Sequence, residues 1–382
     1  MFKKYLFLFL SLSALFSAES HGAHLTANDF NMIWLIPFLG ILLSIAVIPL
    51  ISTKFWHQHY GKVSAFWGLL FLFFFAFNFY DFTLFYILEV YLREFIPFIV
   101  LLLALFTVSG GILITGNLNG TPYLNLCLLL IGTILASIMG TTGASMLLIR
   151  PLIRANSLRK NKTHLIVFFI FLVSNIGGSL TPIGDPPLFL GFLKGVDFTW
   201  TMIYMFKPMI LVSSILLCLF FIIDNYFYKK EKIEPDNNDK FSLKIDGKIN
   251  FILIAIIIAA VILSGHQSMK YSVFEYHGVS MLTAGTLAQL LILLSVTFIS
   301  LKITPNEFRE GNGFTWEPIK EVAKLFATIF LTMVPAIEML KGVTNQIGPL
   351  SWINKIIINE DGTNIDSMYF WLTGVLSSFL DN

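Results

Sequence analysis

The sequence has few charged residues, which make up only 13% of its 382 positions. A soluble domain carries about 25%, so this chain has too few charges to solvate the surface of a soluble protein. Cysteine is also scarce: Cys127 and Cys218 both lie inside apolar runs, which argues against a disulfide framework or a cysteine metal site. We find no nucleophile–base set and no cofactor motif, so we expect neither an enzyme nor a bound cofactor. The net charge of +2 gives no reason to expect a nucleic-acid partner.

Long apolar runs dominate the chain, in which 56% of residues are hydrophobic and 39 are Phe. A helix that crosses the hydrocarbon layer needs about 20 apolar residues. We predict an all-α polytopic membrane protein in contact with the lipid bilayer, with spans at 32–51, 64–80, 95–116, 163–183, 203–224, 249–265, 279–302 and 324–341. Residues 1–20 begin with two lysines, continue with an apolar stretch and end in small residues. They predict a signal peptide or an uncleaved signal anchor.

Two further apolar stretches, 123–149 and 366–382, are interrupted by small and polar residues. We interpret them as re-entrant hairpins. The second is incomplete because the sequence stops at residue 382, which suggests a truncated gene or a fragment.

The basic residues support this arrangement, because lysine and arginine gather in cytoplasmic loops. Arginines and lysines cluster at 150–162 and again at 228–248. The two clusters reach the same side only if 123–149 enters the membrane and returns, and residues 81–94 then form an outer loop. We divide the chain into N-terminal spans (21–94), a first repeat (95–227), a cytoplasmic linker (228–248) and an incomplete second half (249–382). Residues 94–111 resemble 321–338 in the opposite orientation, which indicates an inverted repeat.

The strongest chemical signal is the polar break SNIGGSLTPIGDPP at 174–187. Glycine and proline destabilise a helix interior by about 1 and 3 kcal/mol, and freed backbone groups inside a membrane must face a protein-lined or wet cavity. Asn175, Thr181 and Asp185 would supply oxygen ligands there for a cation. A buried carboxylate such as Asp185 could hold either a proton or a cation. The alternative is an ordinary loop at the membrane surface.

The two hairpin tips supply further candidates for ion or substrate binding. The first tip, at 136–145, offers hydroxyls at Ser137, Thr141 and Thr142, although a tight bend without ligand contact is the alternative. The second tip offers Ser377, Ser378, Asp381 and Asn382. Glu338 follows Pro335 and is a candidate coupling carboxylate, unless it lies near the outer surface beside Lys341.

The motifs SNIGGSLTPIGDPPLFLGF at 174–192, GTTGASMLLIRPLIRAN at 140–156 and LSSFLDN at 376–382 resemble the NhaD-type sodium/proton antiporters. These belong to the ion transporter superfamily, which also contains arsenite permeases and citrate carriers. The resemblance implies discontinuous helices, two inverted-repeat hairpins and exchange of Na⁺ or Li⁺ for H⁺ across the bacterial inner membrane, and it allows a homodimer. Asn175, Asp185, Ser377, Asp381 and Asn382 match ion-site positions. Gly140-Thr141 replaces the Asp-Asn pair of many relatives, and relatives also continue beyond the second hairpin.

Three hypotheses follow. The first is cation/proton antiport with Asp185 carrying the exchanged charge. The second is a carrier of an oxyanion or carboxylate such as arsenite or citrate. We rank it lower because anions favour helix N-termini and nearby arginines, and Arg150 lies past the hairpin tip. The third is a non-functional fragment.

Overall fold

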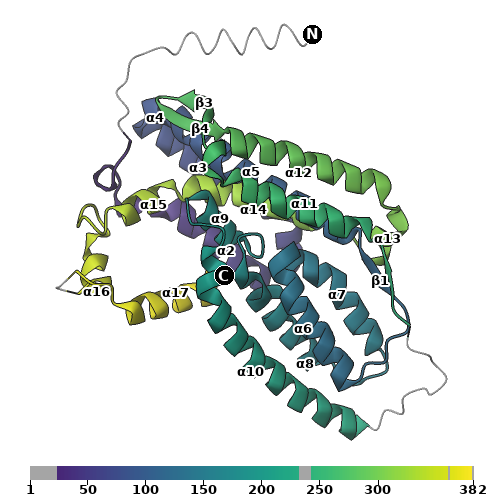
Figure 1. The fold of residues 1–382 in the computed structure, drawn as a ribbon. Helices are drawn as coiled ribbons and strands as arrows, with labels where there is room; N and C mark the ends of the chain where they lie inside the picture. Colours follow the sequence, from purple (N-terminus) through teal and green to yellow (C-terminus); the bar gives the residue numbers. More distant parts are fainter. Residues whose placement is uncertain (1–23, 232–241, 360–361, 381–382) are drawn as a thin grey trace.

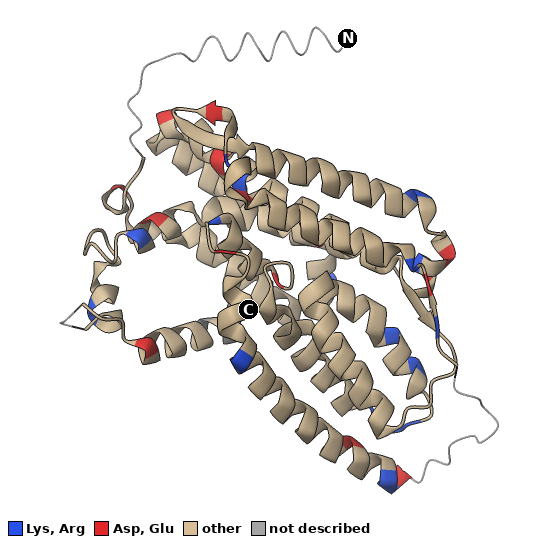
Figure 2. Ribbon diagram, viewed as in Figure 1, with Lys and Arg blue, Asp and Glu red and all other residues tan. Residues whose placement is uncertain are grey.

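The structure is a computed structural model that describes residues 24–231, 242–359 and 362–380 (Figure 1). Within these residues seven helices are long and apolar enough to cross a membrane, and a bent helix pair would add an eighth. Charged residues lie mostly at helix ends and in connections, and the middle sections of the long helices at 249–264 and 284–303 carry none (Figure 2). The predicted all-α polytopic membrane fold is therefore confirmed.

The N-terminal part is a pair of packed helices that begins after two short 3₁₀ turns, η1 (Ala27–Asp29) and η2 (Met32–Leu35). Helix α2 (Ile36–Ile51) packs against α3 (Thr53–Asn78). The predicted span 32–51 is confirmed, whereas the span predicted at 64–80 begins at Thr53. Ser52 explains this early start, because its hydroxyl accepts a hydrogen bond from the Phe55 amide and caps the helix.

The predicted outer loop at 81–94 is wrong, since residues 80–110 form one continuous helical rod. It consists of α4 (Tyr80–Leu88), the π-helical segment η3 (Glu89–Phe95) and α5 (Ile96–Gly110). The charges that suggested a loop are paired within the fold. Arg93 Nη1 lies 2.8 Å from Glu89 Oε1, one helical turn away, and the buried Glu94 carboxylate pairs with Lys194. Local charge pairing therefore makes this polar stretch compatible with a helix.

The predicted first hairpin consists of α6 (Pro122–Met139) and α7 (Thr141–Ala155), which lie side by side (Figure 1). The next span is α8 (Thr163–Phe169), the π-helical η4 (Ile170–Asn175) and the 3₁₀ turn η5 (Ile176–Leu180). Turns then lead to the short helix α9 (Pro186–Leu193) and the long helix α10 (Trp200–Glu231). The helix break expected at 174–187 is therefore present.

The second half starts with strand β2 (Lys244–Asp246), which pairs antiparallel with β1 (Leu113–Thr115). Helix α11 (Ile249–Ser264) and the turn η6 (Gln267–Met269) lead to a β-hairpin of β3 (Ser272–Tyr276) and β4 (Val279–Thr283), followed by α12 (Ala284–Ile303). Helix α13 (Asn306–Gly311) precedes the pair α14 (Glu317–Thr332) and α15 (Val334–Lys341), which bends by 42°. The described residues end with η7 (Ser351–Ile353), α16 (Asn354–Ile357) and α17 (Asp366–Leu380).

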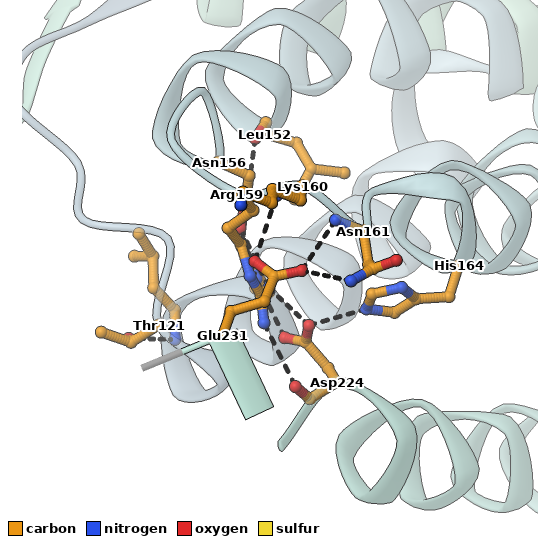
Figure 3. Close-up of polar contacts among 11 residues, drawn as sticks. Thr121, Leu152, Asn156, Arg159, Lys160, Asn161, His164, Asp224 and Glu231 are labelled. Atoms are coloured by element: carbon orange, nitrogen blue, oxygen red, sulfur yellow. Dashed lines mark hydrogen bonds and ion pairs between the residues drawn. The ribbon is translucent and has the colours of Figure 1, made fainter. Parts of the chain in front are cut away.

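A buried polar cluster ties the base of the α6–α7 hairpin to α10 (Figure 3). The side chains of Arg159 and Asp224 are only 2% and 0% exposed, and Arg159 Nη1 lies 2.5 Å from Asp224 Oδ1. The same carboxylate accepts from Asn125 Nδ2 at 3.0 Å and lies 2.8 Å from His164 Nε2. Because these residues come from α6, the α7–α8 connection, α8 and α10, the cluster fixes the hairpin against two other helices.

Candidate functional site

The tip of the first hairpin is a single glycine, Gly140, at which α6 ends and α7 begins. Its φ of 81° and ψ of 151° are accessible mainly to glycine. This conformation turns the chain in one residue and brings the tip against the break in the following span. There the Thr141 amide donates to the Gly184 carbonyl at 2.9 Å.

Two predicted site hydroxyls join the tip and the break. Ser137 Oγ donates to the Gly177 carbonyl. Thr181 Oγ1 donates to the Ser137 carbonyl at 2.5 Å and accepts from the Gly184 amide at 3.2 Å. Ser137, Thr141 and Thr181 therefore lie together, with the first two buried. The Ser137 and Thr181 hydroxyls satisfy loosened backbone groups, so their observed role is to hold the two segments together.

The other two predicted residues of the break flank this junction. Asn175 is half-buried, and its Nδ2 donates to the Ile170 carbonyl at 3.0 Å, which leaves the side-chain oxygen for other contacts. Asp185 is half-buried at the N-cap position of α9. The packing is close, because a Cβ added at Gly178 would lie 2.6 Å from Thr141 Cγ2 and 3.2 Å from Asp185 Cβ. The carboxyl-bearing residue thus borders the hairpin tip.

A cavity of about 570 Å³ lies beside the tip, between α7 and the span α8–η4. Its polar surface comes from hydroxyl groups, including Thr142, Ser145 and Ser174, and the Ser145 and Ser174 oxygens are 2.9 Å apart. Neither acidic nor basic side chains are among the residues that line it. The full lining is Phe106, Thr141, Thr142, Ser145, Met146, Ile149, Ile166, Phe169, Ile170, Ser174, Gly313, Phe314, Thr315 and Pro318. The cavity therefore offers hydrogen bonds within an otherwise apolar wall.

The N-terminus of α7 adds backbone donors to this region. The first backbone hydrogen bond of α7 runs from the Ala144 amide to the Gly140 carbonyl at 3.0 Å. Within the described part of the chain, the Thr142 and Gly143 amides have no hydrogen-bond acceptor. Such amides carry the positive end of the helix dipole. A smaller cavity of about 60 Å³ is lined by Gly140, Thr141, Thr142 and Gly143 and reaches them directly.

The opposite wall of the larger cavity is the connection between α13 and α14. Asn312 fixes it, since its Nδ2 donates to the carbonyls of Gly110 at 3.0 Å and Ile112 at 2.5 Å. Phe314 packs on Phe106 of α5 with ring centroids 4.9 Å apart. The connection therefore has a defined position relative to the end of α5.

The remaining predicted residues lie elsewhere. Ser377 is exposed on α17, whose main contacts are with α16 and α2, and it lines neither cavity. The Ser378 side chain and residues Asp381 and Asn382 lie outside what the structure describes. Glu338 lies on α15, which packs against η1 and η2, and its Oε1 is 2.7 Å from Lys341 Nζ. Most of the second hairpin tip thus lies outside the described residues, and its predicted role in ion binding stays a prediction.

Three cavity hydroxyls were not among the predicted site residues: Ser145, Ser174 and Thr315. Ser145 follows Thr141 and Thr142 at helical spacing, which was a usable signal. Ser174 begins the polar break. Thr315 lies far away in the sequence, and no pattern predicts that it joins the site.

Within the described residues, no group of three or more His, Cys, Asp or Glu side chains could together hold a metal ion. The groups gathered at the tip are instead hydroxyls, backbone amides, loosened carbonyls and one carboxylate. They could bind a small anion through the donors, or a monovalent cation through the oxygens.

Comparison with known proteins identifies a family for this chain. No curated protein and no solved structure matches the sequence significantly. Residues 27–382 match the family described as "Putative citrate transport". The match covers nearly all of a chain whose long apolar helices suit a membrane and whose broken span and hairpin meet at a cavity. The chain belongs to this family of membrane transport proteins.

Proposed function

We propose that this protein is a secondary transporter of a small carboxylate of the citrate class. The observation that carries the proposal is the pair of cavities at the α7 N-terminus, where hydroxyls lie beside the Thr142 and Gly143 amides, which have no acceptor among the described residues. Helix N-termini favour carboxylates because their amides point at the anion and the dipole is positive there. The family description supports the same substrate class.

The size and chemistry of the cavity suit a small organic anion. Its volume of about 570 Å³ lies within the range of about 300–1,000 Å³ of small-molecule sites. Its hydroxyls can donate to carboxylate oxygens and to a substrate hydroxyl. The described residues of the lining include no Asp or Glu, so a carboxylate would meet no like charge from them.

The test is uptake of radiolabelled citrate by proteoliposomes that contain the purified protein. We expect exchange of external for internal citrate, competed by other di- and tricarboxylates. Thr142→Val combined with Ser145→Ala should reduce exchange several-fold. Ser295→Ala is the matched control, because Ser295 lies on α12 and its hydroxyl bonds to its own helix at Leu291. Absence of carboxylate exchange by the wild-type protein would overturn the proposal.

A second candidate function is exchange of Na⁺ or Li⁺ for H⁺, favoured by the position of Asp185. Asp185 borders the tip and the unwound segment around Gly178 through its Cβ, and loosened carbonyls there could share a cation with its carboxylate. In everted vesicles without citrate, such an antiporter would move protons when Na⁺ is added, and Asp185→Asn would stop the movement. The control is Asp197→Asn, since Asp197 lies in the α9–α10 connection and bonds to Thr199. No Na⁺- or Li⁺-dependent proton movement would exclude this candidate.

The cellular location remains part of this proposal. The basic clusters and the signal-like residues 1–20 support insertion into a bacterial inner membrane, with residues 150–162 on the cytoplasmic side.

A further inference from the structure

We propose that Arg150 binds a carboxylate group of the transported anion at the rim of the cavity. This inference rests on the proposed carboxylate transport and names the cation that the cavity lining itself lacks. A polycarboxylate that places one carboxylate on the hydroxyls and the α7 amides leaves its other carboxylates unneutralised. A cationic side chain at the rim would neutralise one of these carboxylates.

The sequence of α7 places Arg150 on the cavity side of the helix. Thr142 and Met146 line the cavity, and Arg150 follows Met146 by the same four-residue step. Residues four apart lie on one face of a helix, and long side chains lean toward its N-terminus. The guanidinium is therefore directed back toward the cavity.

The guanidinium of Arg150 contacts the opposite wall of the cavity, which is the α13–α14 connection and the end of α13. Arg150 Nη1 donates to the Gly311 carbonyl at 3.1 Å. A Cβ added at Gly313, which lines the cavity, would lie only 1.6 Å from Arg150 Nη2. Gly313 also has a φ of 60°, so the connection bends around the guanidinium where no side chain would fit. These contacts set Arg150 at the rim between α7 and the α13–α14 connection.

Arg150 is exposed and has no acidic partner among the described residues. None of the ion pairs among the described residues includes it, whereas Arg93 and Arg159 pair with Glu89 and Asp224. A guanidinium has five N–H donors, and within the described part of the chain Arg150 donates to one carbonyl, that of Gly311. The remaining donors can form a two-point contact with a carboxylate, a geometry that lysine lacks.

The kinetic test compares Arg150→Gln with Arg154→Gln in citrate exchange by proteoliposomes. Arg154 is the matched control, one turn further along α7, because its Nη2 donates to the Ile114 carbonyl at 2.5 Å and not to the α13–α14 region that Arg150 contacts. We expect Arg150→Gln to raise the KM for citrate roughly ten- to hundred-fold, while kcat changes much less. Arg150→Lys should give an intermediate KM, and Arg154→Gln should leave KM nearly unchanged.

A second measurement needs no variant. Phenylglyoxal modifies arginine, and the modification at each site can be followed by mass spectrometry of the wild-type protein. Citrate should slow modification of Arg150 and leave Arg154 unaffected.

The outcomes separate the two proposals. A wild-type protein without carboxylate exchange overturns the proposed function. If the wild-type protein exchanges citrate but Arg150→Gln has the KM of Arg154→Gln, or if citrate protects neither arginine, the role of Arg150 is wrong and the transport function stands.

Discussion

At the residue scale, Gly140 has the most demanding conformation in the site. A Cβ there would meet its nearest neighbour, the Ile183 carbonyl oxygen, at 3.4 Å, which is ordinary contact. The constraint on this position is therefore the backbone dihedral angle and not the available space.

We expect Gly140→Ala to destabilise the protein by about 1–3 kcal/mol, the usual range for a residue held in a sparsely populated conformation. It should also reduce transport, because strain at this position would move α7 relative to Gly184. Thermal unfolding in detergent and citrate exchange measure the two effects.

Gly195→Ala is the control for backbone strain, since Gly195 has a φ of 100° and no atom within 4 Å of an added Cβ. It should lower stability but preserve exchange in the protein that remains folded. Equal loss of exchange in the two variants would contradict a specific role for the Gly140 turn.

The sequence predicted which residues meet at the hairpin tip better than it predicted the outer wall of the cavity. Ser137, Thr141 and Thr181 were predictable because glycine, proline and hydroxyl residues recur where helices break. The structure joins these three residues through the Gly177 and Gly184 backbone. The α13–α14 connection was not predictable as a wall, because its contact with α5 depends on long-range packing through Asn312.

At the element scale, burial and charge pairing decide which segments stay helical. The stretch 81–94 contains enough charge to suggest a loop, yet it continues α5 because Glu89 and Glu94 have basic partners. The partner of Glu94, Lys194, comes from the end of α9, and sequence spacing could not reveal that pair. By contrast, the break at 174–187 was predictable because proline and glycine act locally.

The cluster around Asp224 gives an element-scale prediction. Asp224→Leu would leave the Arg159 guanidinium buried without its carboxylate, and removing one partner of a buried pair costs about 3–5 kcal/mol. Since the cluster joins α6, α8 and α10, the variant should unfold at a lower temperature in detergent.

The double variant Arg159→Met/Asp224→Leu should recover much of the lost stability, because no charge then remains unpaired in the cluster. Glu317→Gln is the exposed control, since its pair with Lys320 is largely solvated and should contribute about 1 kcal/mol or less. A double variant as unstable as Asp224→Leu would argue against charge burial as the cause.

At the scale of the whole molecule, the predictable feature was the set of long apolar helices. The helices predicted from apolar runs are present apart from shifted ends, and the basic residues at 150–162 remain outside them apart from the end of α7. The inverted repeat and a homodimer stay predictions, because they depend on the second hairpin tip and on contacts between copies of the chain.

Sidedness itself makes the last prediction. The β3–β4 hairpin joins the C-terminal end of α11 to the N-terminal end of α12, whereas β2 and α13 lie at the other ends of these two helices. If residues 150–162 are cytoplasmic, the hairpin should therefore be external. In a background with Cys127 and Cys218 replaced by Ser, a membrane-impermeant thiol reagent should label Glu275→Cys in intact bacterial cells. Ser157→Cys, between α7 and α8, should react only after the membrane is permeabilised. Both positions are exposed, so a lack of reaction in intact cells would reflect the membrane and not burial in the protein. If Ser157→Cys is labelled before permeabilisation and Glu275→Cys is not, the predicted orientation is wrong. The cavity rim at Arg150 would then face the outside of the cell.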